Sequence, residues 1–182
     1  MKIRKITLFN RKRFEVPQCI QRIDHRATHG WQVRYGGTKM FSDGSPDGSR
    51  AAASLAKATK ELLSRIAKLP APTMLQNVPN QNKTSDLPVG ISGPIVRQRR
   101  GSRVRECSLS VSLPRFGATQ RCRSIYIGSE NTYTIARYDD AVAKAIRLRQ
   151  QAEEAYRLDA TRAKRAAGRR LKAQQSQRAA RA

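Results

Sequence analysis

Alternating apolar and polar residues predict a sheet in the first half of the chain. Residues 31–35, WQVRY, alternate large apolar with polar side chains and precede two glycines, which predicts a hairpin with 38–42 as its second strand. We expect Trp31 in the core, because Val33 and Tyr35 share its face. A helical stripe then predicts a helix over 50–69, which Asp47 or Ser49 can cap and Pro70 ends.

The second half repeats this order. Residues 94–99 predict a first strand, 107–113 a second, and 121–127 a third, and a helix is expected from Thr134. The inward side of this sheet should hold Leu109, Val111, Ile125 and Ile127. The two halves therefore look like an internal duplication, and the fold class is α+β: two small modules, each a two- or three-stranded antiparallel sheet packed on one helix.

Changes in composition divide the chain into five segments. The stretch between the modules holds four prolines among Asn, Gln, Ser and Thr, which is typical of an extended linker. The predicted segments are a basic N-terminal arm (1–15), a first module (16–69), a Pro/Asn-rich linker (70–87), a second module (88–152) and a basic Ala/Arg-rich tail (153–182).

The tail has two open interpretations. It is helix-prone but has few large apolar residues, so we expect an extension of the second helix that frays toward Gly168. It is either solvated and partly disordered, or ordered on nucleic acid.

Charge narrows the function. The 182 residues include 37 Lys plus Arg against 13 Asp plus Glu, a formal net charge of +24. Such a field favours a polyanionic partner, and the 26 Arg against 11 Lys favour nucleic acid, because guanidinium groups grip phosphate and guanine bidentately. A membrane partner is not expected, since the sequence has neither an apolar run of about 20 residues nor an amphipathic helix with large apolar residues.

Other chemistry finds little support. Cys19, Cys107 and Cys122 have no paired spacing, and His25 with His29 lacks a third ligand, so we expect no metal site. No catalytic constellation or cofactor motif emerges, and the protein is expected not to be an enzyme. The basic amino terminus lacks a secretory signal, so a cytoplasmic, nucleoid-associated location is expected.

The amino-acid sequences of the predicted strands and of the first helix resemble those of a known family. The stretches GWQVRY, TKMFSDG and SRAAASLAKATKELLSRI, and later VRQRRG, LSVSLPR and RSIYIG, are similar to APETALA2/ethylene-response-factor DNA-binding domains of the bacterial and phage type, in two copies. The resemblance covers about residues 16–68 and 87–150 and implies three strands backed by one helix. The first module departs from it in a lost or shortened basic first strand, and the second in serines where base-contacting Arg or Glu is expected.

A sheet laid in the major groove presents alternate side chains to the bases, which selects candidate residues. Arg97 and Arg99 are the best candidates for base edges or phosphates. In the first module Gln32 and Arg34 face outward, with Lys39 close by across the hairpin. The remaining candidates are outward residues of the second sheet or arginines expected to grip phosphates or flank the groove: Arg100, Arg103, Arg105, Ser110, Ser112, Arg121, Arg123 and Tyr126.

These observations predict a non-enzymatic protein that binds double-stranded DNA, as a transcriptional regulator or an architectural factor. Serine hydroxyls tolerate many bases, so positioning is expected more than sequence discrimination. The alternatives are an RNA-binding or ribosome-associated protein and a partner of an acidic protein. Nothing in the sequence indicates the oligomeric state.

Overall fold

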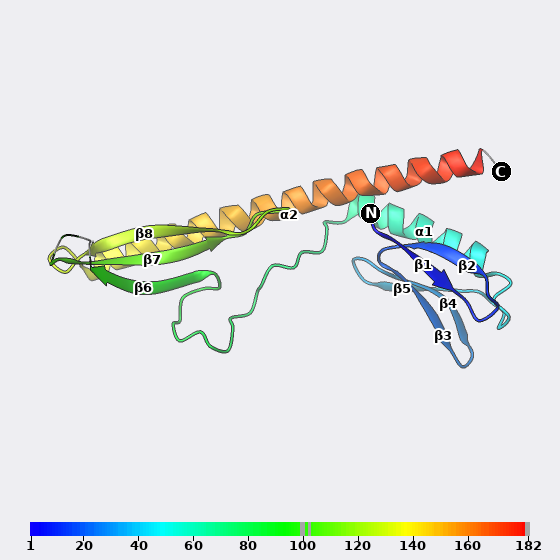
Figure 1. Ribbon diagram of the computed structural model, residues 1–182, viewed down its shortest axis with the longest axis horizontal. Coiled ribbons are helices and arrows are strands. Elements are labelled where there is room, and N and C mark those ends of the chain that lie inside the picture. The colour runs from blue at the N-terminus through cyan, green and yellow to red at the C-terminus, as the bar shows by residue number, and fades with distance from the viewer. Residues whose placement is uncertain (99–100, 102, 181–182) are drawn as a thin grey trace. The chain divides into compact units, whose positions relative to one another are not determined.

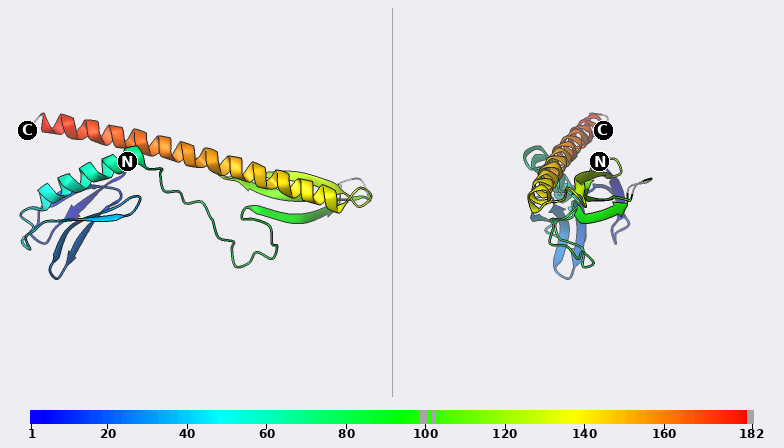
Figure 2. Two further views of the ribbon diagram at one scale, coloured as in Figure 1. Left: turned by 180° about the vertical axis from the view of Figure 1, so that it is seen from behind. Right: turned by 90° about the vertical axis from the view of Figure 1, so that its left-hand side faces the viewer.

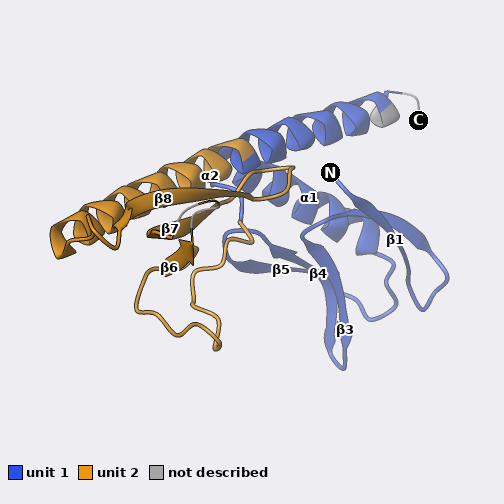
Figure 3. Ribbon diagram, turned by 60° about the vertical axis from the view of Figure 1, so that its left-hand side comes forward, with its two compact units in different colours: residues 1–72, 160–182 blue, residues 73–159 orange. Residues whose placement is uncertain are grey.

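The computed structural model describes residues 1–98, 101 and 103–180, and the chain divides into two compact units. Unit 1 comprises residues 1–72 and 160–182, and unit 2 comprises residues 73–159 (Figure 3). Their described residues form three antiparallel sheets and two helices, which confirms the predicted α+β class with small sheet-plus-helix modules. Within the described residues, no helix is long and apolar enough to cross a membrane.

The predicted N-terminal arm is folded, which corrects our expectation for residues 1–15. Strand β1 (Ile3–Thr7) pairs with β2 (Arg13–Pro17) in a hairpin of unit 1 (Figure 1). Val16 is fully buried, and the Phe14 ring meets Trp31 edge-on with 5.7 Å between centroids. These few apolar contacts order a segment that its charge alone marks as solvated.

The first module also keeps its first strand, contrary to the expectation drawn from the resemblance. Strand β3 (Ile20–His25) pairs with β4 (Thr28–Arg34), and β4 pairs with β5 (Thr38–Ser42). Arg22 lies opposite Trp31 and shares its inward face. This inward arginine interrupts the apolar pattern, which is why hydrophobic alternation did not reveal the strand.

Helix α1 (Ala51–Lys68) matches the predicted helix and covers the β3–β4–β5 sheet. Trp31, fully buried as expected, donates from its indole Nε1 to the carbonyl of Ala51 over 2.8 Å. The predicted cap is wrong: Arg50 occupies the N-cap position and no side chain caps the helix. Asp47 instead accepts from the backbone N–H of Ser49 over 3.0 Å, so it stabilises the preceding loop.

Unit 2 contains the second three-stranded sheet. Strand β6 (Ile91–Gln98) pairs with β7 (Arg105–Leu113), and β7 pairs with β8 (Arg121–Ser129). The predicted inward residues are all buried, as expected: Leu109, Val111, Ile125 and Ile127. They pack with Ala141 and Ala145 at the start of helix α2 (Ile135–Ala179), which runs beside these strands in Figure 2.

A buried arginine fastens α2 to this sheet. The Arg149 side chain donates to the carbonyl of Ser112 and, over 2.6 Å, to Glu153 Oε1 one turn along α2. Gly90 makes room for the guanidinium, since a Cβ there would lie 2.6 Å from Arg149 Nη1. Arg149 therefore has a structural role and is not available to an anionic ligand.

The tail corrects a second expectation, because α2 continues without a break past Gly168. Ala160, Gly168 and Leu171 are buried, although the segment lacks the large apolar residues that we considered necessary. A Cβ on Gly168 would lie 3.0 Å from Ile66 Cγ2 of α1, so the two helices touch closely there. Small residues allow this contact, and the resulting burial replaces what large side chains would supply.

Candidate nucleic-acid interface

The outer face of the β6–β7–β8 sheet carries a row of hydroxyl groups. Strand register places Ser92, Ser110 and Ser124 side by side across the three strands. The neighbouring row contains Ser108 and Tyr126, and the Tyr126 side chain is 56% exposed. We call this surface the serine face; its members are Ser92, Ser108, Ser110, Ser112, Ser124 and Tyr126. The predicted outward parity of Ser110, Ser112 and Tyr126 is thus what the register shows.

The serine face itself carries little net charge. Arg97 is exposed on β6 and has outward parity, and its partner in the register is Glu106 of β7. Cross-strand partners in an antiparallel sheet point to the same side, so a carboxylate accompanies Arg97 on this face. The face is therefore suited to hydrogen bonding at close range more than to long-range attraction.

Arginines gather where β6 turns into β7. Arg103 is exposed in the turn, and Arg105 begins β7 with its side chain 67% exposed. Arg105 is not a free cation, because its Nε lies 3.0 Å from Glu130 Oε2. Hydrogen bonds from Arg105 lower the pKa of Glu130. The candidates Arg99 and Arg100 lie outside the described residues.

Arg121 and Arg123 do not lie on the serine face. In the register they are partners of Leu113 and Val111, so they have inward parity and project toward the side that α2 covers. Arg123 lines a hollow of about 520 Å³ together with Arg137 and Lys144 of α2. From the sequence we expected these two arginines either to grip phosphates or to flank the groove. Their position at the sheet edge allows them to flank a bound polyanion, but they cannot contact bases from the serine face.

Arg137 and Lys144 were missed from the sequence. They are seven residues apart on α2, the spacing that places two side chains on one helix face. Asp140 lines the same hollow, so the site holds three cations and one carboxylate. The spacing was readable, but only the packing of α2 against β8 brings these cations to Arg123.

The first module presents a weaker surface. Gln32 and Arg34 lie on the outer face of β4, and Arg34 Nε donates to Gln32 Oε1 over 2.5 Å. Lys39, the third candidate of this module, does not share the outer face. It is the partner of buried Val33 and has that residue's inward parity. Its Nζ lies 3.6 Å from Glu61 of α1, so its charge is already engaged on the helix side.

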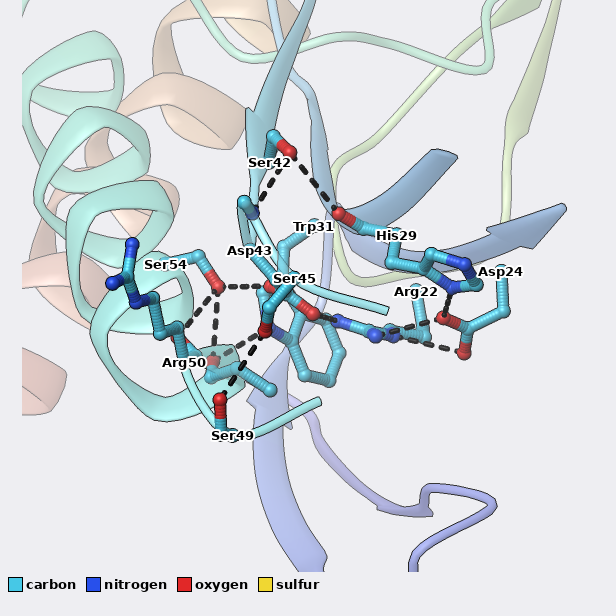
Figure 4. A network of polar contacts seen from close by, with 12 residues as sticks. Arg22, Asp24, His29, Trp31, Ser42, Asp43, Ser45, Ser49, Arg50 and Ser54 are labelled. Atoms are coloured by element: carbon cyan, nitrogen blue, oxygen red, sulfur yellow. Dashed lines mark hydrogen bonds and ion pairs between the residues drawn. The ribbon is translucent and has the colours of Figure 1, made fainter. Parts of the chain in front are cut away.

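A network of ion pairs lies on the inner side of this sheet (Figure 4). Arg22 Nη1 lies 2.6 Å from the fully buried Asp43, and its Nη2 lies 2.7 Å from Asp24. Burial alone would lower the pKa of Arg22, but the two carboxylates raise it. Asp43 in turn accepts from Ser54 of α1. The network fixes the sheet to the helix, and its charges are satisfied internally.

A further concentration of positive charge lies at the end of the chain. Residues 160–182 contain eight Lys or Arg and no Asp or Glu. Most of this segment is the last part of α2, which packs on α1 within unit 1. The charge is therefore held on a helix with a defined face.

Residues 1–98, 101 and 103–180 contain no group of three His, Cys, Asp or Glu side chains that could hold a metal ion. The geometry instead offers hydrogen-bonding groups and cations. Comparison with protein-family models, curated proteins and solved structures finds no match.

Proposed function

We propose that this protein binds double-stranded DNA without catalysing a reaction, and that the serine face of unit 2 lies against the duplex. The observation that carries the proposal is the arrangement of that face: an uncovered sheet surface of short hydroxyl side chains with arginines beyond both ends. Arg97 lies at one end of the face with Arg103 beyond it. Arg115 lies beyond the other end, where Arg121 flanks the sheet edge from the helix side.

Short side chains at the centre favour close approach. A two- or three-stranded ribbon fits the major groove, and serine hydroxyls can both donate to and accept from base edges. Arginines at the ends are placed to reach phosphates, which position a protein on the duplex. Tyr126 adds an exposed aromatic ring and a phenolic hydroxyl to the centre.

This surface favours sequence-tolerant binding. Discrimination between bases relies mainly on bidentate partners such as Arg with guanine or Asn with adenine, and a serine hydroxyl does not supply one. An architectural factor therefore fits better than a regulator of a few defined sites. The first module, with Gln32 and Arg34 outward, adds a second weak contact, and two contacts on one chain raise affinity through effective concentration.

The test is a competition assay with the full chain at fixed salt. Labelled duplex DNA is bound first, and unlabelled duplex DNA, structured RNA or an acidic polypeptide is then titrated. We expect duplex DNA to compete best. Stronger competition by structured RNA would contradict the proposal and favour the RNA-binding alternative. Equal competition by the polypeptide would show that net charge alone drives the interaction.

A second experiment separates the two kinds of DNA-binding protein. Sequences bound by the full chain are selected from a random duplex pool. We expect weak enrichment spread over many sequences, as sequence-tolerant contacts require. A sharp motif would instead indicate a regulator that reads bases.

A further inference from the structure

Unit 1 contains a groove between its two helical segments, away from the outer face of its sheet. One wall comes from α1 and the other from residues 165–175 of α2, and the groove has a volume of about 900 Å³. Its floor is apolar, formed by Leu63, Ile66 and Gly168. None of the candidate nucleic-acid residues lines it.

The groove uses a face of α1 that the sheet does not cover. Residues Ala58 and Leu62 are buried with the sheet core. The residues lining the groove recur instead at Ala56, Lys60 and Leu63, a spacing of four and three that defines a second stripe on the same helix. This stripe extends to residue 67, so the wall is about 16 Å long at 1.5 Å per residue, or three helical turns.

The walls are cationic. Lys60 lies on one side, Arg165, Arg169 and Lys172 lie on the other, and no carboxylate lines the groove. None of these four cations forms an ion pair with a described residue. Four like charges gathered without a counter-charge favour an anionic occupant.

An apolar floor between cationic walls specifies more than a polyanion. A phosphate backbone offers no apolar surface to cover Leu63, which is only half-buried. A helix with an apolar stripe and acidic flanks matches both parts, and a groove between two helices is a recurrent site for such a segment.

We propose that this groove binds an acidic amphipathic helix of a partner protein, about three turns long, with its apolar side chains on the floor and its carboxylates on Lys60, Arg165, Arg169 and Lys172. This interaction is independent of the proposed DNA contact, because the serine face belongs to unit 2 and the groove to unit 1.

The experiment uses the full chain and three fluorescent peptides with anisotropy as the readout. The probe is an 18-residue peptide whose central three helical turns carry a leucine stripe flanked by glutamates. The second peptide has the same composition in scrambled order, and the third replaces the leucines by serine. We expect the probe to bind about tenfold more tightly than either of the others, because both controls keep the glutamates but lack the apolar stripe that the groove requires in addition to charge.

Two adjacent arginines provide a matched pair of variants. Arg169 lines the groove, whereas Arg170 does not, and both are exposed on the same helix. Arg169→Glu should weaken probe binding about tenfold and Arg170→Glu should leave it within about twofold. Circular dichroism of both variants checks that α2 remains folded.

Several outcomes would overturn the proposal. Equal binding of the probe and the scrambled peptide would show that no groove recognises the stripe. Equal effects of the two variants would show that net charge alone, and not the groove, accounts for probe binding. If duplex DNA displaces the probe and Arg169→Glu but not Arg170→Glu lowers DNA affinity, the groove is a nucleic-acid surface. Failure of DNA binding with probe binding intact would contradict only the proposed function.

Discussion

At the scale of single residues, side-chain parity separates cations that can reach a ligand on the serine face from those that cannot. Arg97 has outward parity on β6, while Arg123 projects to the helix side of the same sheet. Lys39 and Arg105 each lie beside a glutamate. The number of basic residues on strands therefore overstates the number that can contact a ligand on the serine face.

Arg97 gives a direct test of the serine face. We expect Arg97→Ala to weaken duplex binding several-fold and to reduce the magnitude of the slope of log affinity against log salt by about 0.9, the loss expected for one phosphate contact. The control Lys57→Ala removes the same charge from an exposed position of α1 outside both proposed sites. Fluorescence titrations at three salt concentrations measure both quantities. Equal slopes for the two variants would rule out a specific contact by Arg97.

The ion-pair network of unit 1 predicts a pH dependence. Partial burial would by itself raise the pKa of Asp24, but hydrogen bonds from Arg22 and His29 and their charges hold it below its ordinary value. A lowered pKa in the folded state stabilises the fold above the pKa of the unfolded chain, and this contribution is lost as the pH falls through the folded value.

The measurement is the thermal midpoint of the full chain and of Asp24→Asn between pH 7 and pH 2. We expect the wild type to be more stable above about pH 5 and the difference to shrink as the pH falls below about 4, the ordinary pKa of an aspartate, toward the lowered pKa of the folded state. A difference that stays constant over this range would show that Asp24 contributes no linked stability.

At the scale of elements, prediction from the sequence succeeded where an element's own pattern of apolar and polar residues marks its buried side. The β6–β7–β8 sheet follows from alternation alone, and its inward set is as expected. Strand β3 and the last part of α2 were misjudged, because each relies on contacts from another element. Arg22 on β3 needs the carboxylate of Asp43, and Gly168 on α2 needs the surface of α1.

Gly168 therefore predicts the effect of filling the contact between the helices. We expect Gly168→Leu to destabilise unit 1 by about 1–3 kcal/mol, because the added side chain collides with Ile66 and overpacked contacts cost this much. Urea unfolding measures the free energy, and hydrogen exchange along α1 locates the effect. The control is Ala163→Leu, at an exposed position of the same helix. If both variants are equally stable, the contact carries no stability.

At the scale of the whole molecule, the net charge of +24 resolves into distinct parts. The N-terminal hairpin, the turn between β6 and β7 and the last part of α2 hold much of it, and the outer faces of the sheets hold little. Both proposed surfaces use hydrogen bonding or apolar contact at the centre and cations at the margin. Positive charge alone attracts any polyanion, so in both proposed surfaces the groups at the centre would select among anionic partners.

Salt dependence tests the charge collectively. If about eight phosphates are neutralised, the slope of log affinity for duplex DNA against log salt is about −7. Titrations of the full chain between roughly 50 and 300 mM salt measure this slope. A slope near −2 would mean that most of the cations do not contact the duplex.

The sequence by itself determined the α+β class, the helix α1, the second sheet and its inward residues, because these depend on local periodicity and turn residues. Only the tertiary structure decided that the N-terminal segment is a hairpin, that α2 continues past Gly168, and which cations lie on which side of a sheet. Each of these depends on a contact between distant residues, such as Phe14 with Trp31 or Gly168 with Ile66. A charged or small side chain acquires its role from the partner that meets it, and that partner is set by packing and not by neighbours in the sequence.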